Sequence, residues 1–380
     1  MTRRARLRLA ALALLFAVSL LLAWRVLPRF GGVHGEASVI QASIPVSSPV
    51  QNQKDLPNVP LRSLAAQRNI HIGAAVQMEP FRSDATYRAL LAKEFNNLIP
   101  ENVMKFGHIQ SERDRYDFVD ADALVAFAQQ HQMQVHGTAL VWYRNLPKWL
   151  TDRPWTREEL LLILRQHIYT VVSRFRGQVN SWDVVNESVS PDGESLRSSI
   201  WLEGIGPEYI GLAFRWAHEA DPAARLFYND YRGEGLGKKS DRIYQLLKEL
   251  KQDNIPIHGV GLQMHVGIDE PPNFAELKTN MQRLNDLGLE VKITEMDVQI
   301  MDGIGSQADK LAAQASIYRN VLRVCLQVPN CTGLSTWGVA DPFSWIRLVN
   351  HRPDSPLLFD DSYRRKPAYS AMQQILKSAD

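Results

Sequence analysis

Short apolar runs alternate with longer amphipathic segments from about residue 61 to the end of the chain. The runs have the length and composition of buried strands, and the segments between them repeat apolar residues with a helical period. Eight runs are predicted to be strands, at 71–76, 97–100, 134–142, 179–186, 225–229, 258–263, 290–294 and 333–337. Helical segments follow at 84–95, 119–132, 156–174, 207–220, 238–252, 273–287, 309–327 and 367–377.

This alternation predicts the fold class. Parallel strands need a long crossover connection, usually a helix, whereas a short hairpin turn joins antiparallel strands. Strands that are joined through helices are therefore predicted to run parallel. Eight strand and helix units suit a closed (β/α)8 barrel, the TIM barrel, better than an open doubly wound sheet. No GxGxxG turn follows the first strand, which further disfavours a dinucleotide-binding sheet. We therefore predict an α/β fold in which residues 61–380 form a (β/α)8 catalytic domain.

The first 60 residues have a different pattern. Four arginines, Arg3, Arg4, Arg6 and Arg8, precede an apolar segment. They predict a signal peptide or a membrane anchor at 1–30, and the sequence leaves both open. The arginine excess predicts that the rest of the chain is exported, as a secreted, periplasmic or membrane-anchored protein with residues 9–27 as the possible tether. Residues 31–60 are rich in Ser, Pro, Gln, Val and Gly, and we predict a flexible, disordered linker.

Composition narrows the class of ligand. Lys and Arg total 43 against 41 Asp and Glu, so the net charge of +2 gives no strong field that would favour nucleic acid. A neutral ligand fits better, and nine Trp suit both core packing and stacking on sugar rings. Cys325 and Cys331 lack zinc-binding spacing, so no thiolate metal site is expected. They form one local disulfide if the chain is exported and are two free thiols if it is cytosolic.

Candidate chemistry lies where the predicted strands end, because the carboxyl ends of all barrel strands meet at one catalytic face. Polar and aromatic residues there are Glu101, Asn102, Lys105, Trp142, Asn186, Glu187, Asn229, Asp230, Gln263, His265, Glu295, Asp297, Trp337, Asp341 and Trp345. Glu187 and Glu295 each directly end a strand. Such a pair of carboxylates fits glycosidic bond cleavage, in which one protonates the leaving oxygen and the other attacks or activates water. The alternative is a structural ion pair with Lys105 or a nearby arginine.

The motifs around these residues resemble those of the family 10 glycoside hydrolases, whose best-known members are endo-β-1,4-xylanases. Trp-Asp-Val-Val-Asn-Glu, ending at Glu187, resembles the acid/base segment, and Ile-Thr-Glu-Met-Asp around Glu295 resembles the nucleophile segment. Residues 101–105 resemble the stretch that binds sugar on the non-reducing side of the cleavage point. Residues 261–265 resemble the segment whose histidine supports the nucleophile, and residues 336–345 resemble the aromatic lid over the sugar subsites.

The resemblance implies a retaining, endo-acting hydrolase of β-1,4-xylosidic bonds in xylan or xylo-oligosaccharides that needs no metal or organic cofactor. Glu295 would be the ionised nucleophile of a double displacement, and Glu187 the protonated acid that later acts as base. Substrate-binding residues would be Glu101, Asn102, Lys105, Trp142, Asn186, Gln263, His265, Trp337 and Trp345, with Asp297 in support. The resemblance also implies a disulfide between Cys325 and Cys331, and we expect a monomer.

Several positions depart from the family pattern. Thr138 and Tyr143 stand where the third-strand motif usually has histidines, and Asn145 stands where a glutamine is common. Phe106-Gly107 replaces the usual Trp-Asp. We place His136 on the opposite face of its strand and do not expect it to substitute for a histidine at 138. The changes motivate a second hypothesis, a barrel hydrolase with shifted β-glycan specificity. A third hypothesis, a catalytically weak carbohydrate-binding envelope protein, is less favoured because binding alone does not need both glutamates.

Overall fold

The strands of this protein form a closed parallel barrel in the computed structural model, which describes residues 59–378. The barrel strands are β1 (His71–Val76), β2 (Asn97–Pro100), β3 (Gln134–Gly137), β4 (Ser181–Asn186), β5 (Arg225–Asp230), β6 (Gly259–Leu262), β8 (Glu290–Gln299) and β9 (Cys331–Thr336). Each strand pairs in parallel with its neighbours, and the β6–β8 and β1–β9 pairings complete the ring. A short strand, β7 (His265–Gly267), pairs with the end of β8. The predicted (β/α)8 TIM barrel is confirmed.

Two strand ends differ by five residues from the sequence prediction, and the other strand boundaries differ by at most two. β3 ends at Gly137 rather than at residue 142. Beyond it, the isolated bridge between Val141 and Val185 and a hydrogen bond from Leu140 N to Asp183 O join this segment to β4. β8 continues to Gln299 rather than ending at 294, because its last residues pair with β7. Both differences arise from pairing partners that an apolar pattern does not specify.

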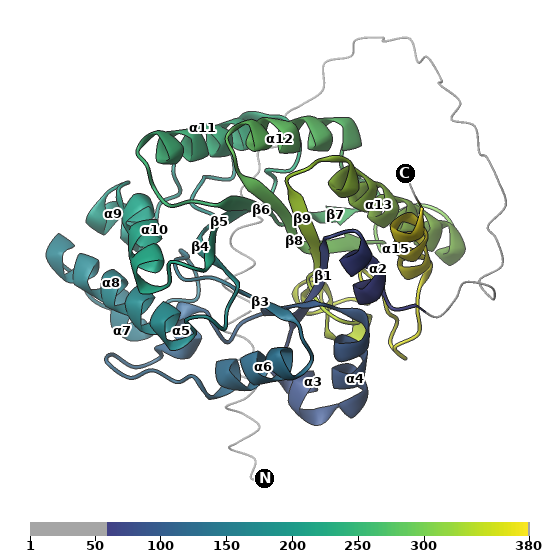
Figure 1. Cartoon of the computed structure of the whole chain (residues 1–380), viewed down its shortest axis with the longest axis horizontal. Helices are drawn as coiled ribbons and strands as arrows, with labels where there is room; N and C mark the ends of the chain where they lie inside the picture. The colour runs from purple at the N-terminus through teal and green to yellow at the C-terminus, as the bar shows by residue number, and fades with distance from the viewer. Residues whose placement is uncertain (1–58, 379–380) are drawn as a thin grey trace. The chain divides into compact units, whose positions relative to one another are not determined.

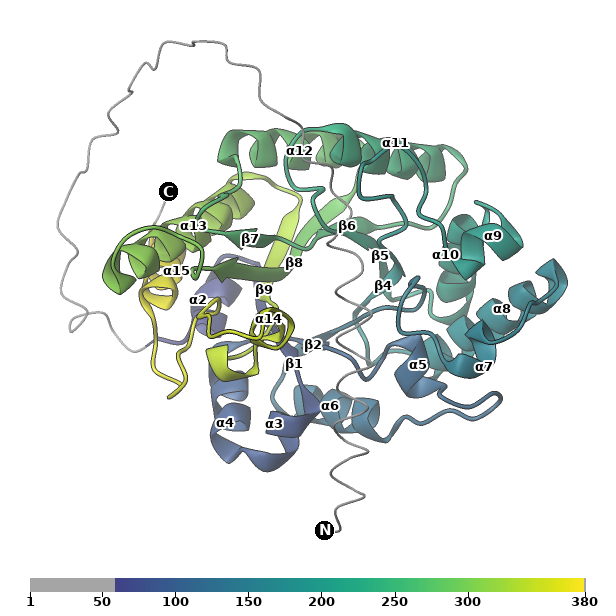
Figure 2. The same ribbon diagram turned by 180° about the vertical axis from the view of Figure 1, so that it is seen from behind.

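Helices surround the ring of strands (Figure 1 and Figure 2). The longer ones are α2 (Leu61–Gln67), α4 (Ala85–Glu94), α6 (Val119–Gln130), α8 (Arg157–Arg174), α10 (Tyr209–Ala220), α11 (Lys238–Gln252), α12 (Phe274–Asp286), α13 (Gln307–Gln327) and α15 (Pro367–Lys377). Thr156 begins α8 with a capping box in which its hydroxyl and the Glu159 carboxylate each accept a backbone hydrogen bond. Eight of these nine helices match predicted segments, and α2 was missed.

The remaining helices are too short for a period to be recognised in the sequence. They are α3 (Met78–Ser83), α5 (Phe106–Ile109), α7 (Lys148–Thr151), α9 (Ile200–Ile205), the 3₁₀ helix η1 (Asp341–Phe343) and α14 (Trp345–Asn350). All of them lie in connections that follow strand ends. In a (β/α)8 barrel such connections build the catalytic face, so the pattern missed segments that are close in sequence to the expected chemistry.

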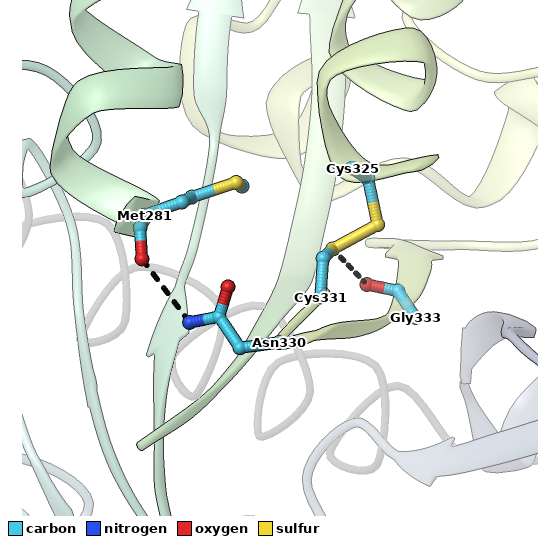
Figure 3. The surroundings of a disulfide bond; sticks show 5 residues. All are labelled: Met281, Cys325, Asn330, Cys331 and Gly333. Carbon is cyan, nitrogen blue, oxygen red and sulfur yellow. Dashed lines mark hydrogen bonds between the residues drawn. A yellow bond between two sulfur atoms is a disulfide. The ribbon is translucent and has the colours of Figure 1, made fainter. Parts of the chain in front are cut away.

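The predicted disulfide between Cys325 and Cys331 is present at the junction of α13 and β9 (Figure 3). In the same turn, Asn330 Nδ2 donates to Met281 O at 3.1 Å (Figure 3). It also donates to Leu289 O at 2.9 Å. The covalent bond and these two hydrogen bonds together hold the entry of the last barrel strand.

No helix within residues 59–378 is both long enough and apolar enough to cross a membrane. The predicted signal or anchor at 1–30, its tether at 9–27 and most of the predicted linker lie outside the described residues. Export, tethering and the monomeric state therefore stay predictions.

Candidate active site

Glu187 directly follows β4 and has a left-handed backbone, at φ 55°. This conformation is uncommon for residues other than glycine. Where it occurs, the surrounding structure holds it in place, and such residues are often found at functional sites. Here the Glu187 amide donates to Asn229 O at 2.8 Å, and Arg197 Nε donates to Glu187 O at 2.8 Å. The buried carboxylate accepts from Gln263 Nε2 at 3.2 Å. Both the backbone and the side chain of Glu187 are therefore held in place by residues from other parts of the barrel.

Glu295 lies buried in β8 and is held by two side chains. Its Oε1 accepts from Asn229 Nδ2 at 2.7 Å, and its Oε2 lies 3.1 Å from His265 Nε2. The other ring nitrogen of His265 lies 2.9 Å from Asp297 Oδ2. The structure thus brings together the predicted nucleophile, its supporting histidine and Asp297.

The electrostatics of this group favour a positively charged histidine. Burial by itself would lower the pKa of His265, but Asp297 and Glu295 outweigh it and raise the pKa well above its ordinary value. Burial raises the pKa of Glu295, while the hydrogen bond and charge of His265 oppose that rise. The two carboxylates thus favour the protonated form of His265, and the hydrogen bond and charge of His265 in turn favour the ionised form of Glu295.

Three amide side chains link the two glutamates. Asn229 Nδ2 donates to Asn186 Oδ1 at 3.0 Å as well as to Glu295. Gln263 Nε2 donates to Asn186 Oδ1 at 3.3 Å as well as to Glu187. Sequence reasoning placed Asn229 on the rim but gave it no role. Its position at the end of β5 was the available signal, and its two acceptors show that it orients Glu295.

A break separates β6 from β7, and Gln263 and His265, on either side of Met264, both contact the glutamates. Met264, between them, has a φ of 66°, and its amide donates to Glu234 Oε1 at 2.9 Å. Alternate residues of a regular strand share a face, so two functional side chains two positions apart do not by themselves require a break. The break instead starts a new strand that pairs with the end of β8 and sets His265 opposite Asp297.

The predicted sugar-binding residues of the β2 end meet two tryptophans. Glu101 Oε1 accepts from Asn102 Nδ2 at 3.2 Å, and Lys105 Nζ donates to Asn102 Oδ1 at 3.0 Å. Lys105 Nζ lies 5.1 Å from the ring centre of Trp142 and 5.7 Å from that of Trp337. Polar groups between two broad rings are the arrangement that sugars require.

Gln77, which follows β1, was not predicted as part of this group. Its Nε2 donates to Glu101 Oε1 at 3.1 Å and to Phe343 O at 2.7 Å. Trp345, the last predicted sugar-binding residue, begins the short helix α14, and its contact with sugar stays a prediction.

The carboxyl group of Glu101 has a raised pKa, and its effect can be tested by measuring the free energy of unfolding. Burial raises its pKa to about 7, against a smaller opposing effect of Lys105. The pKa of Glu101 is higher in the folded protein than in the unfolded chain, so the contribution of this carboxyl to stability is fully present below about pH 4.5. That contribution is lost as the pH rises through about 7. We expect Glu101→Gln to raise the free energy of unfolding at pH 8 by about 1–3 kcal/mol and to change it little at pH 4.5.

Urea unfolding at both pH values measures this difference. Exposed Glu79, on α3, gives the control variant Glu79→Gln, whose stability should not gain with pH. A Glu101→Gln protein no more stable than wild type at pH 8 would contradict the proposed cost of burying this charge.

Two of the departures from the family pattern are parts of one structural change. Gly107 N donates to Asn145 O at 2.7 Å, and a Cβ at position 107 would lie 2.6 Å from that same oxygen. A side chain at 107 is therefore incompatible with this path of the 145 loop. Phe106, the other replaced residue, stacks on His167 with ring centres 3.6 Å apart.

His136 points into the barrel interior, so the expectation that it faces away was wrong. It lines an interior cavity together with residues of β1, β2, β8 and β9, and its Nε2 lies 2.9 Å from Asp183 Oδ1. The negative charge of Asp183 is one of the contributions that raise the pKa of Glu295. The His136–Asp183 pair therefore belongs to the electrostatic surroundings of Glu295, although Thr138 leaves position 138 without an imidazole.

Comparison with known proteins agrees with this geometry. Residues 60–375 match the family described as "Glycosyl hydrolase family 10". The chain is 44% identical over 325 residues to "Endo-1,4-beta-xylanase B" of Thermotoga neapolitana, covering 84% of this chain and 92% of that protein. It is 36% identical over 339 residues to "Exoglucanase XynX" of Acetivibrio thermocellus, covering 86% of this chain but only 30% of that longer protein.

A solved structure is also similar. Xylanase 10B from Thermotoga petrophila, crystallised in complex with xylobiose, superposes with a TM-score of 0.82 at 45% sequence identity. The match covers 85% of this chain and 98% of that one. The barrel, the paired glutamates at its catalytic face and the family match over almost all described residues lead to one conclusion: this chain belongs to glycosyl hydrolase family 10.

Proposed function

We propose that this protein hydrolyses internal β-1,4-xylosidic bonds in xylan or xylo-oligosaccharides with retention of anomeric configuration. The observation that supports it most is the pair of buried glutamates. Three amide side chains link them, and Glu295, but not Glu187, contacts the ring of His265. The two carboxyl groups thus have different surroundings, as an acid and a nucleophile require. The relatives named xylanases support the choice of xylan.

In the proposed first step, Glu295 attacks the anomeric carbon and Glu187 gives its proton to the leaving oxygen. The bond from carbon to the leaving oxygen breaks as the ester bond to Glu295 forms. In the second step Glu187 takes a proton from water, and the water oxygen displaces Glu295. Asn186 lies between the glutamates, with its amide nitrogen 3.5 Å from Glu187 Oε1, and would hydrogen-bond the sugar 2-hydroxyl most strongly in the transition state.

A second candidate is hydrolysis of another β-linked glycan. Two observations favour it: a relative is named an exoglucanase, and Thr138 replaces a histidine next to the cleavage subsite. A threonine is smaller than a histidine, and a hydroxymethyl group on the sugar would need the space saved by such a change.

Product analysis of the purified full-length protein separates these candidates. Xylohexaose and cellohexaose are offered in parallel, and early products are sized and examined by proton NMR. We expect xylohexaose to be cleaved internally and the β anomer to appear first. Early release of the α anomer would exclude retention, and faster cleavage of cellohexaose would favour the second candidate. Binding of xylohexaose by calorimetry without any cleavage would instead support a carbohydrate-binding protein.

A further inference from the structure

We propose that Lys239 and Asp230, a buried ion pair, are positioning residues that hold Glu187 where it can give its proton to the leaving oxygen. The inference rests on the proposed function and adds two residues to the mechanism of the same site. Asp230 ends β5, and Lys239 lies in the first turn of α11. Glu187 and Arg197 line an open hollow of about 190 Å³, whereas Lys239 and Asp230 lie outside its lining.

The ion pair is shielded from solvent. Lys239 Nζ lies 2.8 Å from Asp230 Oδ1, and the two side chains are only 6% and 1% exposed. Burial raises the pKa of Asp230 to about 6, and the charge of Lys239 opposes that rise. A buried ion pair adds little net stability once its desolvation is counted, but removing one partner is strongly unfavourable. The conformation that the pair fixes is therefore a better reason for its presence than the stability that it adds.

One path leads from the pair through Tyr231 and Arg197 to the carbonyl of Glu187. The Tyr231 amide donates to Asp230 Oδ1 at 2.9 Å, and Lys239 Nζ lies 3.4 Å from the centre of the Tyr231 ring. The Tyr231 hydroxyl accepts from Arg197 Nη2 at 2.8 Å, and Arg197 Nε donates to Glu187 O at 2.8 Å. The pair thus holds both the backbone and the ring of Tyr231, and Tyr231 in turn holds Arg197.

A second path leads from Asp230 through Tyr228 to the residues that follow Glu187. The Tyr228 hydroxyl donates to Asp230 Oδ2 at 2.5 Å. The same hydroxyl accepts from the Val189 amide and from Ser188 Oγ, each at 3.2 Å. The two carboxylate oxygens of Asp230 therefore serve the two paths, and both paths end on the backbone next to the proposed proton donor.

Proton donation depends on these contacts because the backbone of Glu187 does not hold its conformation by itself. A left-handed φ, here 55°, persists where the surrounding structure imposes it. A general acid must lie within hydrogen-bond reach of the oxygen that it protonates, and a displacement of about 1 Å can cost about a hundredfold in rate. Glu295 is held separately, by Asn229 and His265. Loss of the ion pair should therefore impair protonation by Glu187 more than attack by Glu295.

The test uses the full-length protein and two aryl β-xylobiosides that have the same sugar and differ only in the leaving group. Dinitrophenolate leaves without a proton and phenolate needs one, so comparing kcat/KM for the two substrates isolates proton donation. In Lys239→Met, we expect kcat/KM for the phenyl substrate to fall about ten- to hundredfold, and that for the dinitrophenyl substrate to change less than about threefold. Tyr231→Phe removes the hydroxyl that accepts from Arg197 and should show a smaller loss, also confined to the phenyl substrate.

Lys238→Met is the matched control, because this neighbouring lysine and its partner Glu194, 3.0 Å away, are both exposed. It should keep the wild-type rates on both substrates. An equal loss on both substrates in Lys239→Met, or no loss in the folded variant, would overturn the inference. If Lys239→Met does not fold, wild-type rates on both substrates in Tyr231→Phe would overturn it instead. A wild-type protein that cleaves neither xylobioside would contradict the proposed function, and the inference with it.

Discussion

Replacing Glu295 by glutamine is expected to lower kcat on an aryl β-xyloside by a factor on the order of 10⁴ or more. An amide cannot attack the anomeric carbon, so the covalent intermediate would not form. The neutral side chain also removes the negative charge of one of the two carboxylates that contact the His265 ring. Substrate binding should change much less, because the tryptophans and the β2 end are not altered.

Steady-state kinetics and calorimetry with xylohexaose measure the two effects separately. Glu290→Gln is the matched control, because Glu290 begins the same strand and pairs with Arg225 on the surface. This control should keep nearly wild-type turnover. If Glu295→Gln turned over an aryl β-xyloside at the wild-type rate, the assignment of the nucleophile would be wrong.

Replacing Glu187 by alanine should slow cleavage of xylohexaose by about 10²–10⁴-fold, while an aryl xyloside with a good leaving group should form the covalent intermediate almost normally. The difference arises because a good leaving group needs no proton, whereas a sugar alkoxide does. The second step would lack its base, so the intermediate should accumulate and produce a burst.

Azide provides the decisive measurement for Glu187→Ala. The small anion needs no general base and fits the space that the lost carboxylate leaves, so it should restore turnover and form a β-xylosyl azide. Glu194→Ala, at an exposed glutamate in the same connection, should show neither the burst nor the azide product. An equal loss on both substrates with no azide adduct would remove Glu187 from the role of acid and base.

The sequence was sufficient to predict the barrel and to place the two glutamates on one face of it, because both predictions depend on local pattern. Alternating strand and helix periods predict parallel strands, and parallel barrel strands place all their carboxyl ends on one face. Glu187 and Glu295 could therefore be assigned to the same region although 108 positions separate them. The same reasoning was wrong for residues 138–142, which were predicted to be part of a strand but lie beyond the end of β3 at Gly137.

Contacts between distant segments could not be predicted in this way. Asn229 and Glu295 are 66 positions apart and Glu187 and Gln263 are 76 apart, yet hydrogen bonds join each pair. Which amide reaches which carboxylate depends on strand register and on backbone turns such as the one at Met264. The sequence alone therefore predicted the pair of carboxylates and the face on which they lie. Only the tertiary structure decided how Asn229, Gln263 and His265 orient them, because hydrogen bonds depend on positions to within a few tenths of an ångström, which no residue pattern specifies.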